Sequence, residues 1–399
     1  MNRPSICFVA PDAYGVLAGR GDLARIGGAE VQQSLIARGL VERGYRVSFA
    51  TLDCGQPDGV EHDGIRVFKT CRWEGGLPGL RFVHPRWTGL VAALRRANAD
   101  LYYQRTAGVE TGQTALWCRW AGRPFVFAAA LDDDCTRALP HLRDWRERTL
   151  YRRGLRRADV VVAQSQRQIA LLRDEYGIAA RQIRSCGKDP LTSGGSIRAT
   201  PPSPMSILWV GRLARQKRPD LLLEIARTSP DLRFDVVGAA NSRSEYANDV
   251  ERRAGALPNV TLHGWIAHAE MPRFFAATGL LLCTSSSEGF PNIFLEAWAH
   301  GVPVVSTVDP DGVITRAGLG AVGNTPAELV AHLRRLSGHP EDWAACARRA
   351  RAHFVENHSV DAAAEAYDTL FMSLAAGRAD SRSVPDPNPR AANSSLPPP

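Results

Sequence analysis

The chain has 399 residues, of which 44% are hydrophobic and 23% charged, a balance that fits a soluble globular protein and excludes fibrous and wholly disordered classes. This length exceeds that of one ordinary core, so two domains are expected. Lys and Arg number 49 against 41 Asp and Glu, and the formal net charge of +8 favours an anionic partner of some kind.

No apolar run approaches the roughly 20 residues that a membrane-spanning helix needs, and the apolar run at 5–11 is too short for a secretory leader. We therefore expect a cytoplasmic protein. The eight cysteines are scattered, with no CxxC pair and no zinc-like spacing, and are interpreted as reduced thiols. They are Cys7, Cys54, Cys71, Cys118, Cys135, Cys186, Cys283 and Cys346.

The first half of the chain alternates short β-rich runs with helical segments. A long helix is expected over 28–43, which stops at a glycine. Strands are expected at 5–11, 45–51, 99–106, 124–131 and 158–165. Such alternation predicts a parallel sheet wrapped by helices. Residues 190–204 then carry four Pro and two Gly, which is the composition of a linker.

The same rhythm restarts after the linker and predicts a second doubly wound α/β domain. Strands are expected at 206–211, 233–238, 260–265, 279–286 and 302–307. The pattern is purely helical over 326–376, and the polar, Pro-rich residues 378–399 are expected to be disordered. The predicted domains are therefore 1–189 and 205–358, and a helix over 359–377 is expected to pack near the first domain.

The segment EGFPNIFLE follows the strand expected at 279–286 and leads into a helix. Glu288 would lie in the loop and Glu296 about one turn into the helix, with Pro291 in the first turn. A helix start favours phosphate, and a nearby carboxylate can accept hydrogen bonds from sugar hydroxyls. The spacing alone is equally compatible with two solvated charges at a helix start.

Two further loops strengthen the hypothesis of a phosphate-bearing ligand. Arg212 and Lys217 follow the first strand of the second domain, where they could neutralise a departing diphosphate; a solvated basic loop is the alternative. Gly27 and Gly28 open the long helix of the first domain and would let the backbone approach a ligand, although a plain turn explains them equally well. Neither a GxGxxG fingerprint nor a P-loop is present.

Taken together, these motifs resemble the GT-B glycosyltransferases of family 4 over nearly all of residues 5–375. The motifs are GGAE (27–30), QSQRQIALLRDEYGI (164–178), VGRLARQKRPDLLLEI (210–225), LHGW (262–265) and SSEGFPNIFLEAWAHGVPVVST (286–307). The resemblance implies two Rossmann-like domains facing a central cleft, with C-terminal helices crossing back to the N-terminal domain. It also implies an N-terminal acceptor-binding domain, a C-terminal domain that binds the nucleotide sugar, and no required metal or other cofactor.

The resemblance assigns roles to the candidate residues. Glu288 would contact hydroxyls of the transferred sugar and Glu296 the ribose, while Arg212 and Lys217 would bind the diphosphate. Gly28 would approach the phosphates from the opposite domain. The resemblance further places at the donor site Gly27, His263, Gly264, Trp265, Gly289, Phe290, Pro291, Asn292 and Ile293.

One run departs from the family pattern. Many members carry a His after the strand expected at 124–131, where this chain has Asp132, Asp133 and Asp134. Asp132 or Asp133 could replace that His as a contact to sugar hydroxyls, and Asp133 is the catalytic candidate. The position could also be dispensable, because the leaving phosphate oxygen can take the acceptor proton. A metal-binding DxD is the remaining alternative, but it would lie in the wrong domain for a GT-B donor.

Residues 137–157 concentrate the positive charge around an apolar face. A basic helix of this kind can lie on an anionic membrane surface, or it can be an ordinary surface helix whose Arg stems cover the core. Its arginines include Arg143, Arg146, Arg148, Arg152, Arg153, Arg156 and Arg157, and its apolar residues are Leu142, Trp145, Leu150, Tyr151 and Leu155.

The expected function is transfer of a sugar, with retention of its anomeric configuration, from a UDP- or GDP-sugar to a glycan or lipid-linked saccharide. The setting would be cell-surface polysaccharide or glycolipid biosynthesis, in the cytoplasm or on the inner face of the plasma membrane. Two alternatives stay open: an epimerase-like enzyme that modifies nucleotide sugars, and a sugar-nucleotide-binding protein without catalysis. A nucleic-acid partner is not expected, because only the net charge favours it.

Overall fold

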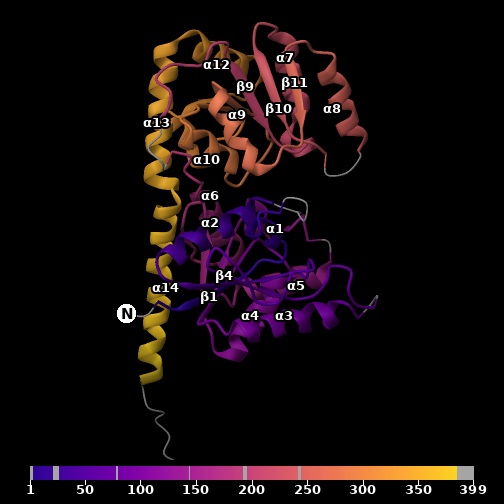
Figure 1. The fold of residues 1–399 in the computed structure, drawn as a ribbon, viewed down its shortest axis with the longest axis vertical. Helices are drawn as coiled ribbons and strands as arrows, with labels where there is room; N and C mark the ends of the chain where they lie inside the picture. The colour runs from indigo at the N-terminus through magenta and orange to yellow at the C-terminus, as the bar shows by residue number, and fades with distance from the viewer. Residues whose placement is uncertain are drawn as a thin grey trace, which may run out of the picture.

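The computed structural model describes residues 3–20, 27–77, 80–142, 144–191, 196–240 and 244–383. Within these ranges the chain forms two β-sheets, one above the other along the long axis of the molecule, with a long helical segment running beside both (Figure 1). The lower sheet in Figure 1 and its helices are termed the N-terminal half, and the upper ones the C-terminal half. The predicted α/β fold with two Rossmann-like sheets is confirmed.

The N-terminal sheet has the strand order β3-β4-β2-β1-β5-β6-β7-β8, in which β3 is antiparallel to β4 and the other pairs are parallel. The strands are β1 (Ser5–Val9), β2 (Arg46–Thr51), β3 (Val60–His62), β4 (Ile65–Lys69), β5 (Leu101–Arg105), β6 (Phe125–Ala128), β7 (Val160–Ala163) and β8 (Arg181–Gln182). Ile6 and Phe8 pack on one face, Cys7 and Val9 on the other. A sheet covered on both faces explains why the run is apolar throughout.

Helices cover both faces of this sheet. On one face lie α1 (Tyr14–Leu17), α2 (Gly28–Glu42) and α14 (Val360–Ser383). On the other lie α3 (Thr88–Ala97), α4 (Val109–Ala121), α5 (Trp145–Leu155) and α6 (Gln166–Tyr176). Short helical turns occur at η2 (Phe82–Trp87) and η3 (Asp132–Cys135).

The C-terminal sheet is entirely parallel, in the order β11-β10-β9-β12-β13-β14. Its strands are β9 (Ser206–Val210), β10 (Arg233–Val237), β11 (Val260–Gly264), β12 (Leu280–Cys283), β13 (Val304–Ser306) and β14 (Gly320–Val322). The buried residues of β9 again alternate between two cores, with Ile207 and Trp209 on one face and Leu208 on the other. All carboxyl ends of these strands therefore lie along one edge of the sheet.

The helices of the C-terminal half follow the same two-sided arrangement. Against the face of Ile207 pack α7 (Pro219–Thr228), α8 (Glu245–Gly255) and α12 (Pro326–Gly338). Against the face of Leu208 pack α9 (Met271–Ala277), α10 (Asn292–Ala299) and α11 (Val313–Ala317). The 3-10 turns are η4 (Arg215–Lys217), η5 (His268–Glu270) and η6 (Pro310–Gly312).

The last two helices return the chain to its N-terminal half, as predicted (Figure 1). Helix α13 (Pro340–His358) packs in the C-terminal half, and α14 packs against α2. A hydroxyl pair, Tyr103 and Tyr367 at 3.1 Å, fixes α14 to the N-terminal sheet. Helix α14 extends to Ser383, so residues 378–383 of the segment predicted to be disordered are helical, and the remainder of that segment, 384–399, lies outside the described residues.

The chain passes between the halves at two places that adjoin each other. The first passage includes the expected linker, of which residues 192–195 lie outside the described ranges. The second is the junction of α13 and α14. Gly187 N–H donates to His358 O at 2.8 Å, and Gly187 forms an isolated parallel bridge with Ser359. The outgoing and returning segments are therefore hydrogen-bonded to each other.

Candidate active site

The candidate site is built on two loops at the carboxyl ends of β9 and β12. The Thr284 hydroxyl accepts a hydrogen bond from Trp209 Nε1 at 2.9 Å and donates to Lys217 O at 2.7 Å. Ser286 N–H donates to Gln216 O at 2.8 Å. These bonds join the loop after β9 to the loop after β12 as one unit.

Lys217 and Glu288 form an ion pair within that unit. The Lys217 side chain is 20% exposed to solvent and the Glu288 side chain 9%, so the pair lies at the boundary of the protein interior. Arg212 follows the same strand but is exposed, and among the described residues its guanidinium has no hydrogen-bond or ion-pair partner. The unit thus offers a carboxylate, a paired ammonium and a guanidinium that is available to an anion.

The predicted positions of the two glutamates agree with the structure. Helix α10 begins at Asn292, so Glu288 lies in the loop and Glu296 is the fifth residue of the helix. Pro291 was expected in the first helical turn, but it is the residue before the helix, with an extended ψ of 121°. Gly301, with φ of +70°, ends the helical segment in the left-handed conformation that glycine favours.

The start of α2 meets the start of α10 across the two halves. Asn292 Nδ2 donates to Gly28 O at 3.3 Å, and Asn292 Oδ1 accepts from Gln32 Nε2 at 3.2 Å. A Cβ atom at Gly28 would lie 2.6 Å from Asn292 Nδ2, so glycine permits this close approach. Gly27 caps α2 and donates its N–H to Glu30 Oε2 at 2.9 Å. The structure therefore brings Gly28 to the segment that holds Glu288.

The segment from Glu288 to Glu296, here termed the donor segment after the role that the resemblance implies, also touches the loop after β6. A Cβ atom at Gly289 would lie 2.9 Å from Ala130 O and 3.2 Å from Gln168 Nε2, so the backbone here passes close to the N-terminal half. The Phe290 ring, half-buried, lies 5.0 Å from the ring of His358. Ile293, beside it, packs at the edge of the same core.

The three consecutive aspartates have three different environments. Asp134 is buried and accepts hydrogen bonds from the N–H groups of Ala130 at 2.8 Å, Leu131 at 3.0 Å and Ala107 at 3.2 Å, so it shapes the loop. Asp132 accepts from Arg167 Nε at 2.7 Å; burial raises the pKa of Asp132, and Arg167 opposes that shift. Asp133 is exposed. No group of three or more His, Cys, Asp or Glu side chains in the described ranges is arranged to hold a metal ion.

His263, Gly264 and Trp265, which the resemblance places near the nucleobase of the donor, lie farther along the C-terminal sheet than Glu288 does. His263 Nε2 is 2.7 Å from Asp235 Oδ1, and its ring is 4.9 Å from that of Phe274. Trp265 is 66% exposed, and Gly264 has φ of +67°. They belong to the edge strand β11 and its following loop, and β10 separates that strand from β9. A ligand reaching from Glu288 to Trp265 would therefore pass the ends of several strands.

Three residues at the interface were not predicted. Gln32 bonds to Asn292, Gln168 lies beside Gly289, and Asp311 in the loop after β13 bonds to the start of α6. Gln32 could have been found, because it lies one helical turn after Gly28 on the same face. No sequence signal identifies the other two.

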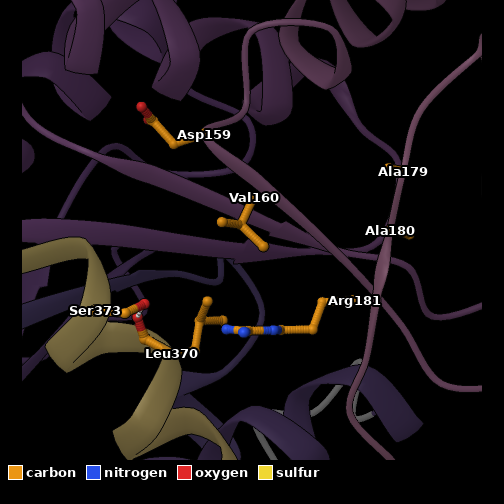
Figure 2. A pocket seen from close by; sticks show the side chains of 7 residues that line it. All are labelled: Asp159, Val160, Ala179, Ala180, Arg181, Leu370 and Ser373. Atoms are coloured by element: carbon orange, nitrogen blue, oxygen red, sulfur yellow. Dashed lines mark hydrogen bonds between the residues drawn. The ribbon is translucent and has the colours of Figure 1, made fainter. Parts of the chain in front are cut away.

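Two cavities in the described part of the chain differ in their distance from the candidate site. The larger, of about 500 Å³, is bounded by β7, β8 and α14, away from the donor segment, and Arg181 extends across it toward Leu370 (Figure 2). The smaller, of about 180 Å³, borders Phe290, His358 and Asp311. Of the two, only the smaller adjoins the candidate site.

The basic helix predicted within 137–157 is α5, and its apolar side is mostly covered. Leu142, Tyr151 and Leu155 are buried, and a Cβ atom at Gly112 of α4 would lie 2.5 Å from Leu150 O. Trp145 is the exception among these apolar residues, with 69% exposure. Arg143 lies outside the described residues. No helix in the described part of the chain is both long and apolar enough to span a membrane.

Comparison with known proteins gives a consistent family. Residues 204–339 match the family model described as glycosyl transferases group 1, and residues 27–186 match that of the glycosyl transferase 4-like domain. The chain is 30% identical over 256 residues to a D-inositol 3-phosphate glycosyltransferase of Geodermatophilus obscurus, which covers 57% of this chain and 56% of that protein. It is 33% identical over 144 residues to the lipopolysaccharide 1,6-galactosyltransferase of Salmonella typhimurium, covering 33% of this chain and 40% of that protein.

A solved structure extends the likeness to the whole fold. The Anabaena protein HepE, in complex with UDP-glucose, superimposes with a TM-score of 0.70 at 18% identity, over 94% of this chain and all of the other. The chain spans about half the length of the curated relatives that it matches.

Proposed function

The chain belongs to the family 4 glycosyltransferases with the GT-B fold, and on that premise we propose that it transfers a sugar from a nucleotide-diphosphate sugar to a saccharide acceptor. The observation that carries the proposal is the joined loop unit in which Glu288 pairs with Lys217, and in which the loop after β9 also carries the exposed Arg212. Across from it lies the start of α2, with the close approach at Gly28. Cations, a carboxylate and helix starts are the groups that a diphosphate and a sugar require.

In this reaction the bond between the anomeric carbon and the phosphate oxygen breaks, and the acceptor hydroxyl oxygen bonds to the same face of that carbon. Arg212 and Lys217 neutralise the charge that develops on the leaving diphosphate. Glu288 accepts hydrogen bonds from hydroxyls of the sugar, and Glu296 binds the ribose. The acceptor proton passes to the released diphosphate oxygen, so retention needs no separate protein base. Asp133, exposed after β6, is the candidate contact to the sugar from the N-terminal half.

The donor is proposed to carry uridine or guanosine, and the acceptor to be a glycan or lipid-linked saccharide of the cell surface. The UDP-glucose bound to HepE supports uridine, and the similarity to a lipopolysaccharide galactosyltransferase supports a cell-surface glycan as the acceptor. We propose no metal or other cofactor, since Arg212 and Lys217 supply the positive charge at the diphosphate.

The experiment that tests the proposal has two steps. A thermal-shift screen against UDP-, GDP-, ADP- and TDP-sugars identifies the donor, because a ligand that binds only the folded state raises its stability. That donor is then incubated with candidate acceptors while free nucleoside diphosphate is measured. Release that depends on the acceptor supports transfer. Conversion of the donor without any acceptor would instead support epimerisation, and binding without turnover would support a binding protein.

An anionic membrane surface is the proposed additional partner, through residues 137–157. Arg153, Arg156 and Arg157 are exposed, and Arg146 lies over the exposed ring of Trp145 at 5.7 Å. Such a basic, Trp-bearing surface suits the boundary of an anionic bilayer. The protein should co-sediment with phosphatidylglycerol vesicles and not with phosphatidylcholine vesicles. Equal sedimentation with both, or unchanged binding after Arg153, Arg156 and Arg157 are replaced by Glu, would contradict this partner.

A further inference from the structure

The loop after β13 reaches across the interface and caps a helix of the other half. Asp311 Oδ2 accepts from Gln166 N–H at 2.8 Å, and its Oδ1 accepts from Arg167 N–H at 3.2 Å. These are first-turn groups of α6, which have no partner within their own helix. The hydroxyl of Ser165, the residue before α6, accepts from Gln168 N–H at 3.2 Å. The cap of α6 is therefore completed by a carboxylate from the C-terminal half.

The backbone around Asp311 is shaped to present that carboxylate. Asp311 has φ of +54°, in the left-handed region that L side chains other than Asn and Asp rarely adopt, and Gly312 follows with φ of +68°. Asp309, two residues earlier, has a different role: its carboxylate accepts from Ile314 and Thr315 N–H, at 2.7 and 3.2 Å, within its own half. The two aspartates can therefore be compared directly, because Asp309 bonds within its own half and Asp311 bonds to the other half.

The first turn of α6 contacts both sides of the candidate site. Arg167 Nε donates to Asp132 Oδ2 at 2.7 Å, in the loop that also carries Asp133. Gln168 is fully buried, and its Nε2 lies 3.2 Å from where a Cβ atom would be on Gly289. Among the described residues Gln168 Nε2 has no hydrogen-bond partner. When the first turn of α6 is held in place, the distance between the donor segment and the loop that carries Asp132 and Asp133 is therefore held constant as well.

We propose that Asp311 is a positioning residue for the transfer reaction. By capping α6 from the opposite half, it holds the arrangement in which the first turn of that helix contacts Asp132 through Arg167 and lies beside Gly289 through Gln168. The effect of Asp311 on turnover rests on the proposed function, whereas its effect on how the two halves are held together does not. A second contact between halves, Asn292 with Gln32, lies at the start of α2, so the donor segment is flanked by both.

Three variants of the full chain separate the possible roles of Asp311. Asp311→Gly suits the positive φ but removes the carboxylate, so it tests the cap without adding strain. Asp311→Asn keeps the backbone conformation and one acceptor oxygen. Asp309→Ala is the control, since it removes a helix cap of similar kind that does not cross the interface.

Hydrogen exchange of the amides of Gln166 and Arg167 provides the direct measurement. In Asp311→Gly their exchange should accelerate by about tenfold or more, because a hydrogen bond to a charged group is lost. Asp311→Asn should give an intermediate rate. In Asp309→Ala these two amides should keep their wild-type rate, while those of Ile314 and Thr315 exchange faster. Unchanged exchange of Gln166 and Arg167 in Asp311→Gly would overturn the proposal.

Small-angle scattering and kinetics test the consequence for the reaction. Asp311→Gly should have a larger radius of gyration than the wild type in the absence of ligand, with a higher donor KM and a lower kcat, and Asp311→Asn should recover part of both. If exchange and scattering change but kcat and KM do not, the positioning role is wrong. If the wild type transfers no sugar at all, the proposed function fails, and the exchange and scattering results still decide whether Asp311 joins the halves.

Discussion

Lys217 and Glu288 form an ion pair between the loops that follow β9 and β12. These loops are also joined by hydrogen bonds from the Thr284 hydroxyl to Lys217 O and from Ser286 N–H to Gln216 O, so the pair does not have to hold them together. Both charged groups instead belong to the proposed donor site. On that proposal, a diphosphate that interacts with Lys217 would free the carboxylate of Glu288 to accept hydrogen bonds from the hydroxyls of the sugar.

Glu288→Gln should lower kcat for transfer by about 10- to 100-fold, since a hydrogen bond to a charged group contributes about 1.5–3 kcal/mol. Lys217 keeps 20% exposure and can be solvated, so the melting temperature should change little. Steady-state rates and a thermal melt check both statements. The control is Glu224→Gln, which removes an exposed carboxylate of α7 in the same half. Near-wild-type turnover of Glu288→Gln would remove this residue from the site.

Arg212→Ala should weaken the affinity for the nucleoside diphosphate by about tenfold or more and leave the free energy of unfolding unchanged. The exposed guanidinium has no partner among the described residues, so no internal contact is lost. Calorimetric titration with UDP and GDP measures the effect. Arg215→Ala is the matched control, because that exposed guanidinium lies over the Tyr246 ring at 4.8 Å. If Arg212→Ala and Arg215→Ala weakened nucleoside diphosphate binding equally, the loss of positive charge, and not the position of Arg212, would explain the effect.

Gly28→Ala should raise the donor KM several-fold, because the added Cβ would meet Asn292 Nδ2 at 2.6 Å and displace that amide from its hydrogen bonds to Gly28 O and Gln32. In an Asn292→Ala background the same substitution should cost less, since the clashing amide is gone. The double-mutant cycle measures this coupling directly. Strict additivity of the two substitutions would show that the close approach at Gly28 does not matter for donor binding.

Stability should fall on acidification through His358. Burial lowers the pKa of His358 from 6.5 to about 3, so between these values the folded state binds fewer protons than the unfolded chain. The free energy of unfolding should therefore decrease as pH falls below 6.5, by up to about 1.4 kcal/mol per pH unit. His358→Asn keeps a donor for Ser185 O and should reduce this slope. Urea unfolding at pH 7.5 and 5.0 gives the comparison, and equal slopes for both proteins would contradict it.

Burial also lowers the pKa of His353 and His300. The His358→Asn variant should consequently retain some pH dependence of the same sign. The prediction concerns the difference between the two proteins, which isolates one histidine.

Long apolar runs made most of the fold predictable. Each of the ten predicted strands is found, because a strand buried on both faces must be apolar throughout. The missed strands β3, β8 and β14 have only two or three residues, too few to show a period of two. Strand β4 is longer and lies beside β2, but its alternating IRVFK was not identified.

Within the candidate site, sequence signals predicted the local position of each residue, whereas the meeting of Gly28, Lys217 and Glu288 was expected only from the family resemblance. Glu288 and Glu296 follow a strand and start a helix, and both signals are local. The bonds of Asp311 to α6 and of Gln32 to Asn292 join residues 145 and 260 positions apart. Such pairs depend on how the two halves meet, which no periodicity encodes. The covering of α5 by α4 is of the same kind, since it depends on tertiary packing.

The two chain passages between the halves are hydrogen-bonded to each other at Gly187, His358 and Ser359. Two well-separated joints would define one hinge axis and restrict the halves to rotation about it, whereas adjoining passages act as a single joint about which the halves can rotate in more than one direction. The covalent chain therefore leaves the orientation of the two halves largely open. That orientation is set by contacts away from the joint, among them those of Asn292 with Gln32 and of Asp311 with the start of α6.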